Sequence, residues 1–140
     1  MSSTAYEPES TVSVHVPHEQ ASAARVRWRF AADLRAAHVT GQVADDALLI
    51  ASELVTNAVR HARPLQPGGL RVSWQISPAQ IGVSVTDGGS ATAPAALAAA
   101  KSALGGRGLH IVHHLASAWD VSRSREGTTV WAVLARAAPA

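Results

Sequence analysis

The sequence predicts an α/β two-layer sandwich, in which a mixed, mostly antiparallel sheet is covered on one face by helices. Five short segments alternate apolar and polar residues, as half-buried strands do, and three segments carry apolar residues at helical spacing. Their order is β-α-α-β-β-α-β-β, and no long linker interrupts it. We therefore expect a single domain at residues 11–136, preceded by a flexible tail at residues 1–10.

Composition and charge limit the classes of protein to consider. The chain has 140 residues, of which 47% are hydrophobic and 16% charged, and this balance excludes wholesale disorder. No run approaches the roughly 18 apolar residues of a membrane span. The start of the chain is unlike a secretory signal and there is no cysteine, so we expect a cytoplasmic protein without disulfides or thiolate metal sites. The net charge is +2 and the arginines are spread out, so we expect no direct contact with nucleic acid or membrane.

The first half of the chain is predicted to form one strand and two helices. The strand is Thr11–Val16, whose sequence TVSVHV alternates strictly. The helices are Glu19–His38 and Gln42–His61, because both segments place apolar residues on one helical face. In the first helix these apolar residues are Ala23, Val26, Phe30 and Leu34.

The second half is predicted to form two hairpins with a helix between them. The expected elements are strands Leu70–Ile76 and Ile81–Thr86, a helix at Leu109–Ala118, and strands Trp119–Arg123 and Thr129–Ala135. The intervening segment Ser90–Leu104 is alanine-rich and has few large apolar side chains, so it would pack only weakly on a core. We expect all four tryptophans in the core or at its edge; they are Trp28, Trp74, Trp119 and Trp131.

A polar pair on the second predicted helix is the first candidate for chemistry. Glu53 and Asn57 are four residues apart and share one helical face among apolar neighbours. A carboxylate can act as a general base, and a carboxamide oxygen can ligate Mg²⁺. The alternative is a solvated edge of the helix. Arg60 and His61 follow on the same face, where they would either reach phosphate oxygens or stabilise the helix C-terminus; the residues alone favour the second.

Two glycine-containing segments are the other candidates. Asp87 ends a predicted strand and precedes Gly88 and Gly89, so its carboxylate could bind an exocyclic amine while the glycines admit a ligand close to the backbone. The same residues are also common in turns. The segment 105–108 (GGRG) opens a predicted helix and could bind an anion, although it matches neither a Walker A loop nor a dinucleotide fingerprint.

Four segments together resemble the N, G1, G2 and G3 boxes of the GHKL ATPase superfamily, which has the Bergerat fold. They are ELVTNAVRHA (53–62), DGG (87–89), GGRGLHIV (105–112) and GTTV (127–130). Within that superfamily the chain is most similar, over residues 10–135, to the small actinobacterial members of the anti-sigma factor serine/threonine kinase family. The resemblance implies a histidine-kinase-like ATPase fold that binds ATP and Mg²⁺. It also implies transfer of the γ-phosphate to a serine of a small antagonist protein, binding of a sigma factor, and a fold that allows a homodimer.

The resemblance also implies roles for individual residues. Asn57 would ligate Mg²⁺, and Glu53 would accept the proton of the substrate serine. Asp87 would bind the adenine amino group with the help of Thr128 or Thr129, and Ser90–Leu104 would form a lid. The residues expected to bind the nucleotide are Asn57, Arg60, His61, Asp87, Gly89, Gly106, Arg107, Gly108, Thr128 and Thr129.

Two further features distinguish the activities that the superfamily offers. Glu53 stands where histidine kinases usually have asparagine, and the chain has no phosphoacceptor helix hairpin. Direct transfer to a hydroxyl, or attack by water, is therefore favoured over phosphotransfer from a histidine. Ala91 stands where many relatives have the second glycine of the G1 box. This alanine and the short predicted lid allow an alternative to the kinase. In that alternative the chain is a non-catalytic ATP-binding partner-switch module that sequesters a regulatory protein.

Overall fold

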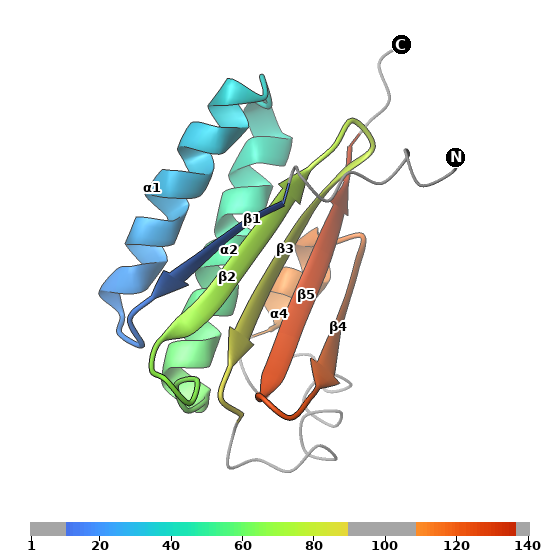
Figure 1. Cartoon of the computed structure of the whole chain (residues 1–140). Helices are drawn as coiled ribbons and strands as arrows, with labels where there is room; N and C mark the ends of the chain where they lie inside the picture. Colours follow the sequence, from blue (N-terminus) through green and yellow to red (C-terminus); the bar gives the residue numbers. More distant parts are fainter. Residues whose placement is uncertain (1–10, 90–108, 137–140) are drawn as a thin grey trace, which may run out of the picture.

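The computed structural model of the chain describes residues 11–89 and 109–136 (Figure 1). The elements in these ranges are β1 (Thr11–Val16), α1 (Ala21–Ala36), α2 (Gly41–His61), β2 (Leu70–Ile76), β3 (Gln80–Asp87), α4 (His110–Leu115), β4 (Ala118–Arg123) and β5 (Thr128–Ala135). This order confirms the predicted succession of strands and helices. The predicted tail and lid lie outside the described residues.

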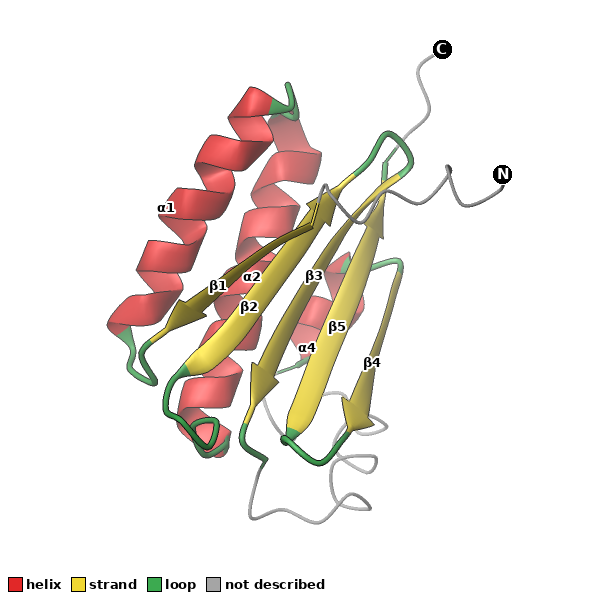
Figure 2. Ribbon diagram, viewed as in Figure 1, coloured by secondary structure: helices red, strands yellow, loops and turns green. Residues whose placement is uncertain are grey.

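The described strands form one sheet in the order β1-β2-β3-β5-β4, and helices cover one of its faces (Figure 2). The predicted two-layer sandwich is therefore confirmed. The sheet was expected to be mixed, but each pairing among the described strands is antiparallel. The pairing of β1 with β2 is antiparallel because α1 and α2 run in opposite directions (Figure 1). The two helices return the chain to the end of β1, where Val16 pairs with Leu70 at the start of β2.

The core lies between the sheet and the apolar faces of α1 and α2. Val26, Phe30 and Leu34 of α1 are buried at the spacing that the sequence predicted. The ring of Phe30 stacks on Trp74 of β2 with 4.8 Å between the ring centroids. The buried indole still has a polar partner, because Trp74 Nε1 donates a hydrogen bond of 2.8 Å to Asp33 Oδ2. This contact joins α1 to the sheet.

The other face of the sheet, which we call the open face, has no helix on it in the described part of the chain (Figure 2). Strand residues alternate between the two faces, so pairs in register share a face. The open face consists of Thr11, Ser13, His15, Arg71, Ser73, Gln75, Gly82, Ser84, Thr86, Ala118, Asp120, Ser122, Thr129, Trp131 and Val133. Apart from Thr86, which is 4% exposed, none of these residues is buried, whereas most of their strand neighbours that face the helices are.

The prediction that all tryptophans lie in or beside the core is wrong for Trp28. Trp74 and Trp119 are buried, but Trp28 is 77% exposed and Trp131 is 36% exposed. Trp28 is two residues away from both Val26 and Phe30, and two residues correspond to about 200° around a helix, so its side chain points away from the core. Trp131 lies in a strand, but on the open face.

The last helix is shorter than expected. It was predicted to reach Ala118, but α4 ends at Leu115 and Ala116 is already extended. The following strand begins at Ala118, so that Trp119 pairs with Ala132 and is buried with it on the helix side of the sheet. Within the described ranges, no helix has the length and apolar character needed to cross a membrane.

Candidate functional site

Asn57 is a buried polar residue in an otherwise apolar stripe of α2. It lies three residues after Leu54 and seven after Ile50, and all three side chains face the core. Its side chain is 8% exposed, and its Oδ1 atom is buried without a hydrogen-bond partner among the described residues. The interpretation of this position as a solvated helix edge is therefore wrong. An orphaned buried carbonyl oxygen is costly unless a ligand satisfies it.

Glu53 lies one turn before Asn57 on α2 and is half-buried. The predicted spacing thus places the carboxylate and the carboxamide on neighbouring turns of one helix. Because Glu53 is partly exposed, it remains accessible to a molecule that approaches the end of α2.

Asp87 and Thr128 form the second part of the site, at the end of the sheet. Asp87 is the last residue of β3 and pairs with Thr128, the first residue of β5. Both are buried and continue the helix-facing rows of Val85 and Val130. The Oγ1 atom of Thr128 has no hydrogen-bond partner in the described part of the chain. Asp87 Oδ1 accepts a hydrogen bond of 2.7 Å from the Gly89 backbone N–H, which orients the carboxylate.

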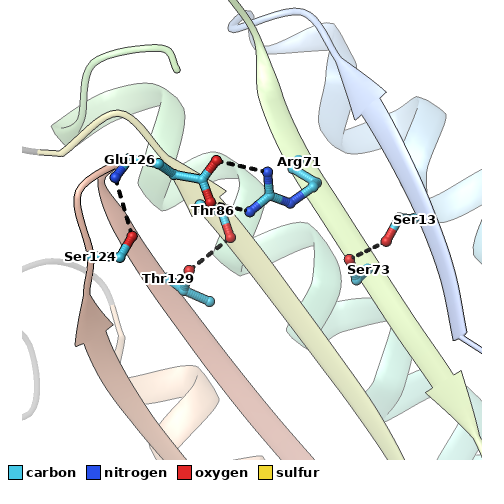
Figure 3. A network of polar contacts seen from close by, with 7 residues as sticks. All are labelled: Ser13, Arg71, Ser73, Thr86, Ser124, Glu126 and Thr129. Carbon is cyan, nitrogen blue, oxygen red and sulfur yellow. Dashed lines mark hydrogen bonds and ion pairs between the residues drawn. The ribbon is translucent and has the colours of Figure 1, made fainter. Parts of the chain in front are cut away.

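Thr129 lies on the opposite side of the sheet. Its hydroxyl is 2.8 Å from the hydroxyl of Thr86, and both side chains belong to the open face (Figure 3). Beside them, Arg71 makes two hydrogen bonds with Glu126, of 3.0 and 2.5 Å. Of the two threonines that the sequence left as alternatives, Thr128 is the one whose side chain shares the helix-facing side with Asp87.

Two glycines allow the chain segments around Asp87 to approach closely. A Cβ atom at Gly88 would lie 1.9 Å from the carbonyl oxygen of Pro64, and one at Gly127 would lie 1.8 Å from that of Asp87. Such distances are impossible without a backbone shift. Gly88 was predicted to admit a ligand. The structure shows another reason for glycine at this position, because any side chain there would clash with the backbone of Pro64. Gly89, by contrast, has a φ of +97°, a conformation that favours glycine.

Backbone hydrogen bonds join the end of α2 to the segment after β3. The Gly88 N–H donates to the Arg63 carbonyl at 2.8 Å, and the Arg63 N–H donates to the Gly89 carbonyl at 2.9 Å. His18 adds a contact of 2.8 Å between its Nε2 atom and the Ala62 carbonyl. Sequence reasoning missed these contacts, since only the breaker RPLQPGG (63–69) indicated that the chain turns here. They hold the helix that carries Asn57 next to the strand that carries Asp87.

The structure does not bring every predicted site residue into this group. Arg60 and His61 lie on the exposed last turn of α2, where the positive charge of Arg60 suits the helix C-terminus. Gly106, Arg107 and Gly108 lie outside the described residues. The candidate group consists of Glu53 and Asn57 on α2, and of Asp87, Gly89 and Thr128 where β3 ends and β5 begins.

The chemistry of this group fits a nucleotide and a hard cation. The Asn57 and Thr128 side-chain oxygens lack partners, and the Asp87 carboxylate can accept further hydrogen bonds. Oxygen ligands of this kind suit Mg²⁺, and a buried carboxylate beside a hydroxyl suits a ring with an exocyclic amine.

Comparison with known proteins identifies the family. The profile of the histidine kinase-like ATPase domain matches residues 16–134, and the chain belongs to this family. A solved structure with a similar fold is that of the RsbU and RsbW domains of Rv1364c from Mycobacterium tuberculosis, with a TM-score of 0.66 and 21% sequence identity. The similarity covers 91% of this chain and 33% of that chain, so this chain corresponds to about a third of the length of its relative. A search of curated proteins finds no matching sequence.

Proposed function

We propose that the chain is an ATP-dependent serine/threonine protein kinase of the anti-sigma regulatory type. It transfers the γ-phosphate of ATP to a serine of a small antagonist protein, binds a sigma factor, and acts in the cytoplasm. Membership of the histidine kinase-like ATPase family implies ATP binding. The likeness in fold to a structure that contains an RsbW domain supports the regulatory role. The observation that carries the proposal is the buried, unpartnered Oδ1 atom of Asn57.

Each part of the site has a role in binding the nucleotide. The Asn57 carboxamide oxygen holds Mg²⁺, which neutralises phosphate charge when bound. Asp87 accepts a hydrogen bond from the adenine amino group, and Thr128 lies beside it in register. Gly89 leaves room at the adenine. The phosphates are held by Gly106, Arg107 and Gly108, which precede α4 in the sequence, together with Arg60 as a cation and His61 as a hydrogen-bond donor at the end of α2.

Glu53 accepts the proton in the transfer step. The serine oxygen of the antagonist attacks the γ-phosphorus, and its proton passes to the Glu53 carboxylate. The bond between the γ-phosphorus and the bridging oxygen of ADP breaks, and ADP leaves with that electron pair. Positioning and charge neutralisation supply most of the catalysis in such reactions, so a general base contributes a smaller factor.

Calorimetry with ATP tests the binding site. We expect Mg²⁺-dependent binding in the wild type and its loss in Asn57→Ala, because no other described side chain offers an orphaned amide oxygen there. Asp45→Asn is the matched control, since Asp45 is an exposed acid on the same helix. Wild-type protein that fails to bind millimolar ATP would overturn the proposal.

Replacement of Glu53 separates the kinase from its alternative. We expect Glu53→Gln to bind ATP like the wild type while phosphoryl transfer to the antagonist falls by about 10²–10⁴-fold. The alternative is a non-catalytic ATP-binding module that sequesters a regulatory protein, and Ala91, in place of a glycine of the G1 box, favours it. Such a module would show no transfer in the wild type and full sequestration in Glu53→Gln.

A further inference from the structure

Three of the seven histidines of the chain lie on the short helix α4, and each of the three is exposed. They are His110, His113 and His114, and their helix lies beside α2 on the helix-covered side of the sheet (Figure 1). The proposed function uses none of them. Imidazole is the side chain that most often binds transition metals, so the contacts of each ring decide whether the cluster can hold an ion.

His113 is already engaged by a contact within the fold. The indole of Trp119 donates a hydrogen bond of 3.2 Å from Nε1 to His113 Nδ1, and the two rings meet edge to face. An indole N–H can only donate, so Nδ1 is the acceptor and the proton of the neutral imidazole is on Nε2. Neither nitrogen of His113 is then available to a metal. Its role is structural, because it joins α4 to the buried Trp119 of β4.

His110 and His114 have no such contact. Neither ring has a hydrogen-bond or ion-pair partner in the described part of the chain. The two residues are four apart, so they lie on successive turns of one helical face with their Cβ atoms about 5–6 Å apart. The same spacing brings two histidines to one zinc ion in the metalloprotease motif H-E-x-x-H. Both rings can therefore direct a nitrogen lone pair to one point beside α4.

The packing of α4 holds this pair in place. Leu109 and Val112 are buried in the core, with exposed fractions of 4% and 0%. The hydrogen bond between Trp119 and His113 fixes the helix from another side. Ligands on an element that is already fixed need little ordering when an ion binds, so less affinity is lost.

A hollow beside the pair indicates the class of ion. Its volume is about 520 Å³, and Leu49, Ile111 and Leu115 line it together with the three histidines. No carboxylate is among the described residues of this lining. Hard cations such as Mg²⁺ and Ca²⁺ prefer oxygen ligands, whereas imidazole suits the ions of zinc, copper and nickel. The lining therefore favours a transition metal.

We propose that His110 and His114 form a binding site for one divalent transition-metal ion, with Zn²⁺ as the expected occupant. The described residues contain no group of three His, Cys, Asp or Glu side chains that could hold a metal ion, so water completes the coordination. The site is separate from Asn57, which lies on another helix and offers Mg²⁺ an oxygen. The inference goes beyond the proposed function and does not depend on it.

Calorimetry with ZnCl₂ tests the proposal on the full chain, without a purification tag and without nucleotide. We expect one Zn²⁺ to bind per chain. Two imidazoles are half the ligands of a structural zinc site, so the dissociation constant should be on the order of 1–100 µM. His110→Ala and His114→Ala should each raise this constant by at least about tenfold. CuCl₂ should bind to the same pair more tightly than ZnCl₂ does.

Two variants are matched controls for the loss of a histidine. His15→Ala removes an exposed histidine from β1, and His113→Phe keeps a ring against Trp119 but has no nitrogen. Both should leave the affinity for Zn²⁺ unchanged. Thermal melts confirm that each variant is folded. The melting temperature of the wild type should rise with added ZnCl₂, and that of the double variant at His110 and His114 should not.

Wild-type protein that binds no Zn²⁺ at millimolar ZnCl₂ would overturn the proposal. Binding that survives both His110→Ala and His114→Ala would also overturn it, as would an equal loss of affinity in His113→Phe. Asn57→Ala separates this site from the proposed function, because it should lose ATP binding and keep its affinity for Zn²⁺. Wild-type protein that binds Zn²⁺ but not ATP would contradict the proposed function alone.

Discussion

Asp87 and Thr128 lie directly opposite each other at the ends of β3 and β5, and both side chains are buried on the helix-facing side of the sheet. The Asp87 carboxylate is oriented by the Gly89 N–H, while the Thr128 hydroxyl has no partner among the described residues. A buried hydroxyl without a partner is costly unless a ligand satisfies it, and the proposed function places adenine here.

Valine substitutions at the two neighbouring threonines should have opposite effects. Thr128→Val removes an unpaired buried hydroxyl, so we expect the free energy of unfolding without ligand to rise by about 1 kcal/mol and ATP affinity to fall about tenfold. Thr129→Val leaves the Thr86 hydroxyl without its partner, so stability should fall by about 1 kcal/mol with ATP affinity unchanged. Denaturant unfolding and calorimetry measure both quantities. Equal losses of affinity in the two variants would contradict the assignment of Thr128.

Asn57→Leu should separate stability from binding. The leucine continues the stripe of Ile50 and Leu54 and removes the orphaned oxygen, so we expect the protein without ligand to gain about 1–2 kcal/mol of stability. Mg²⁺-dependent ATP binding should disappear. Asn57→Asp is the comparison, because it keeps an oxygen ligand while burying a charge, and should retain binding at reduced stability. A destabilised Asn57→Leu variant would show that the carboxamide has a structural partner.

Alanine at two of the glycines near the site should disrupt the fold. Gly88→Ala and Gly127→Ala each place a Cβ atom within 2 Å of a backbone carbonyl oxygen, so we expect losses of at least about 2 kcal/mol. Gly82→Ala is the control, because the nearest atom to its added Cβ is the Gln75 side-chain oxygen at 3.7 Å. Thermal unfolding of the three variants measures the difference. A control that melts as early as the other two would point to a general effect of glycine replacement.

The Arg71–Glu126 pair should make a small, pH-dependent contribution to stability. Its hydrogen bond with Arg71 lowers the pKa of Glu126, and the same bond raises the pKa of Arg71. A carboxylate whose pKa is lowered by folding stabilises the protein above its ordinary pKa, near 4.3, and loses that effect as the pH falls through the lowered value. Glu126→Gln should therefore lower Tm by no more than about 2 °C at pH 7, and the difference should vanish in acid. Thermal melts across pH 3–7 test this; a difference that grows on acidification would contradict it.

The placement of several candidate site residues could be anticipated from local patterns, because each placement depended on the residue's own helix or strand. Glu53 and Asn57 share a face through helical spacing alone. The side of Thr128 could also have been predicted, since it continues the alternation of Val130 and Ala132, as Asp87 continues that of Val83 and Val85. The close approach of Gly88 to Pro64 could not have been predicted from local patterns, because it depends on where the end of α2 meets the end of β3.

The sequence by itself determined the order and type of the elements, the faces of α1 and α2, and the four segments that identify the family. Those properties are encoded within a few residues, by periodicity and by turn-forming residues. Only the tertiary structure decided that Asn57 is left with an unsatisfied oxygen, that Thr128 pairs directly with Asp87 across β3 and β5, and that Gly88 approaches the carbonyl oxygen of Pro64. Each depends on register and packing between segments far apart in the chain, which local patterns do not specify.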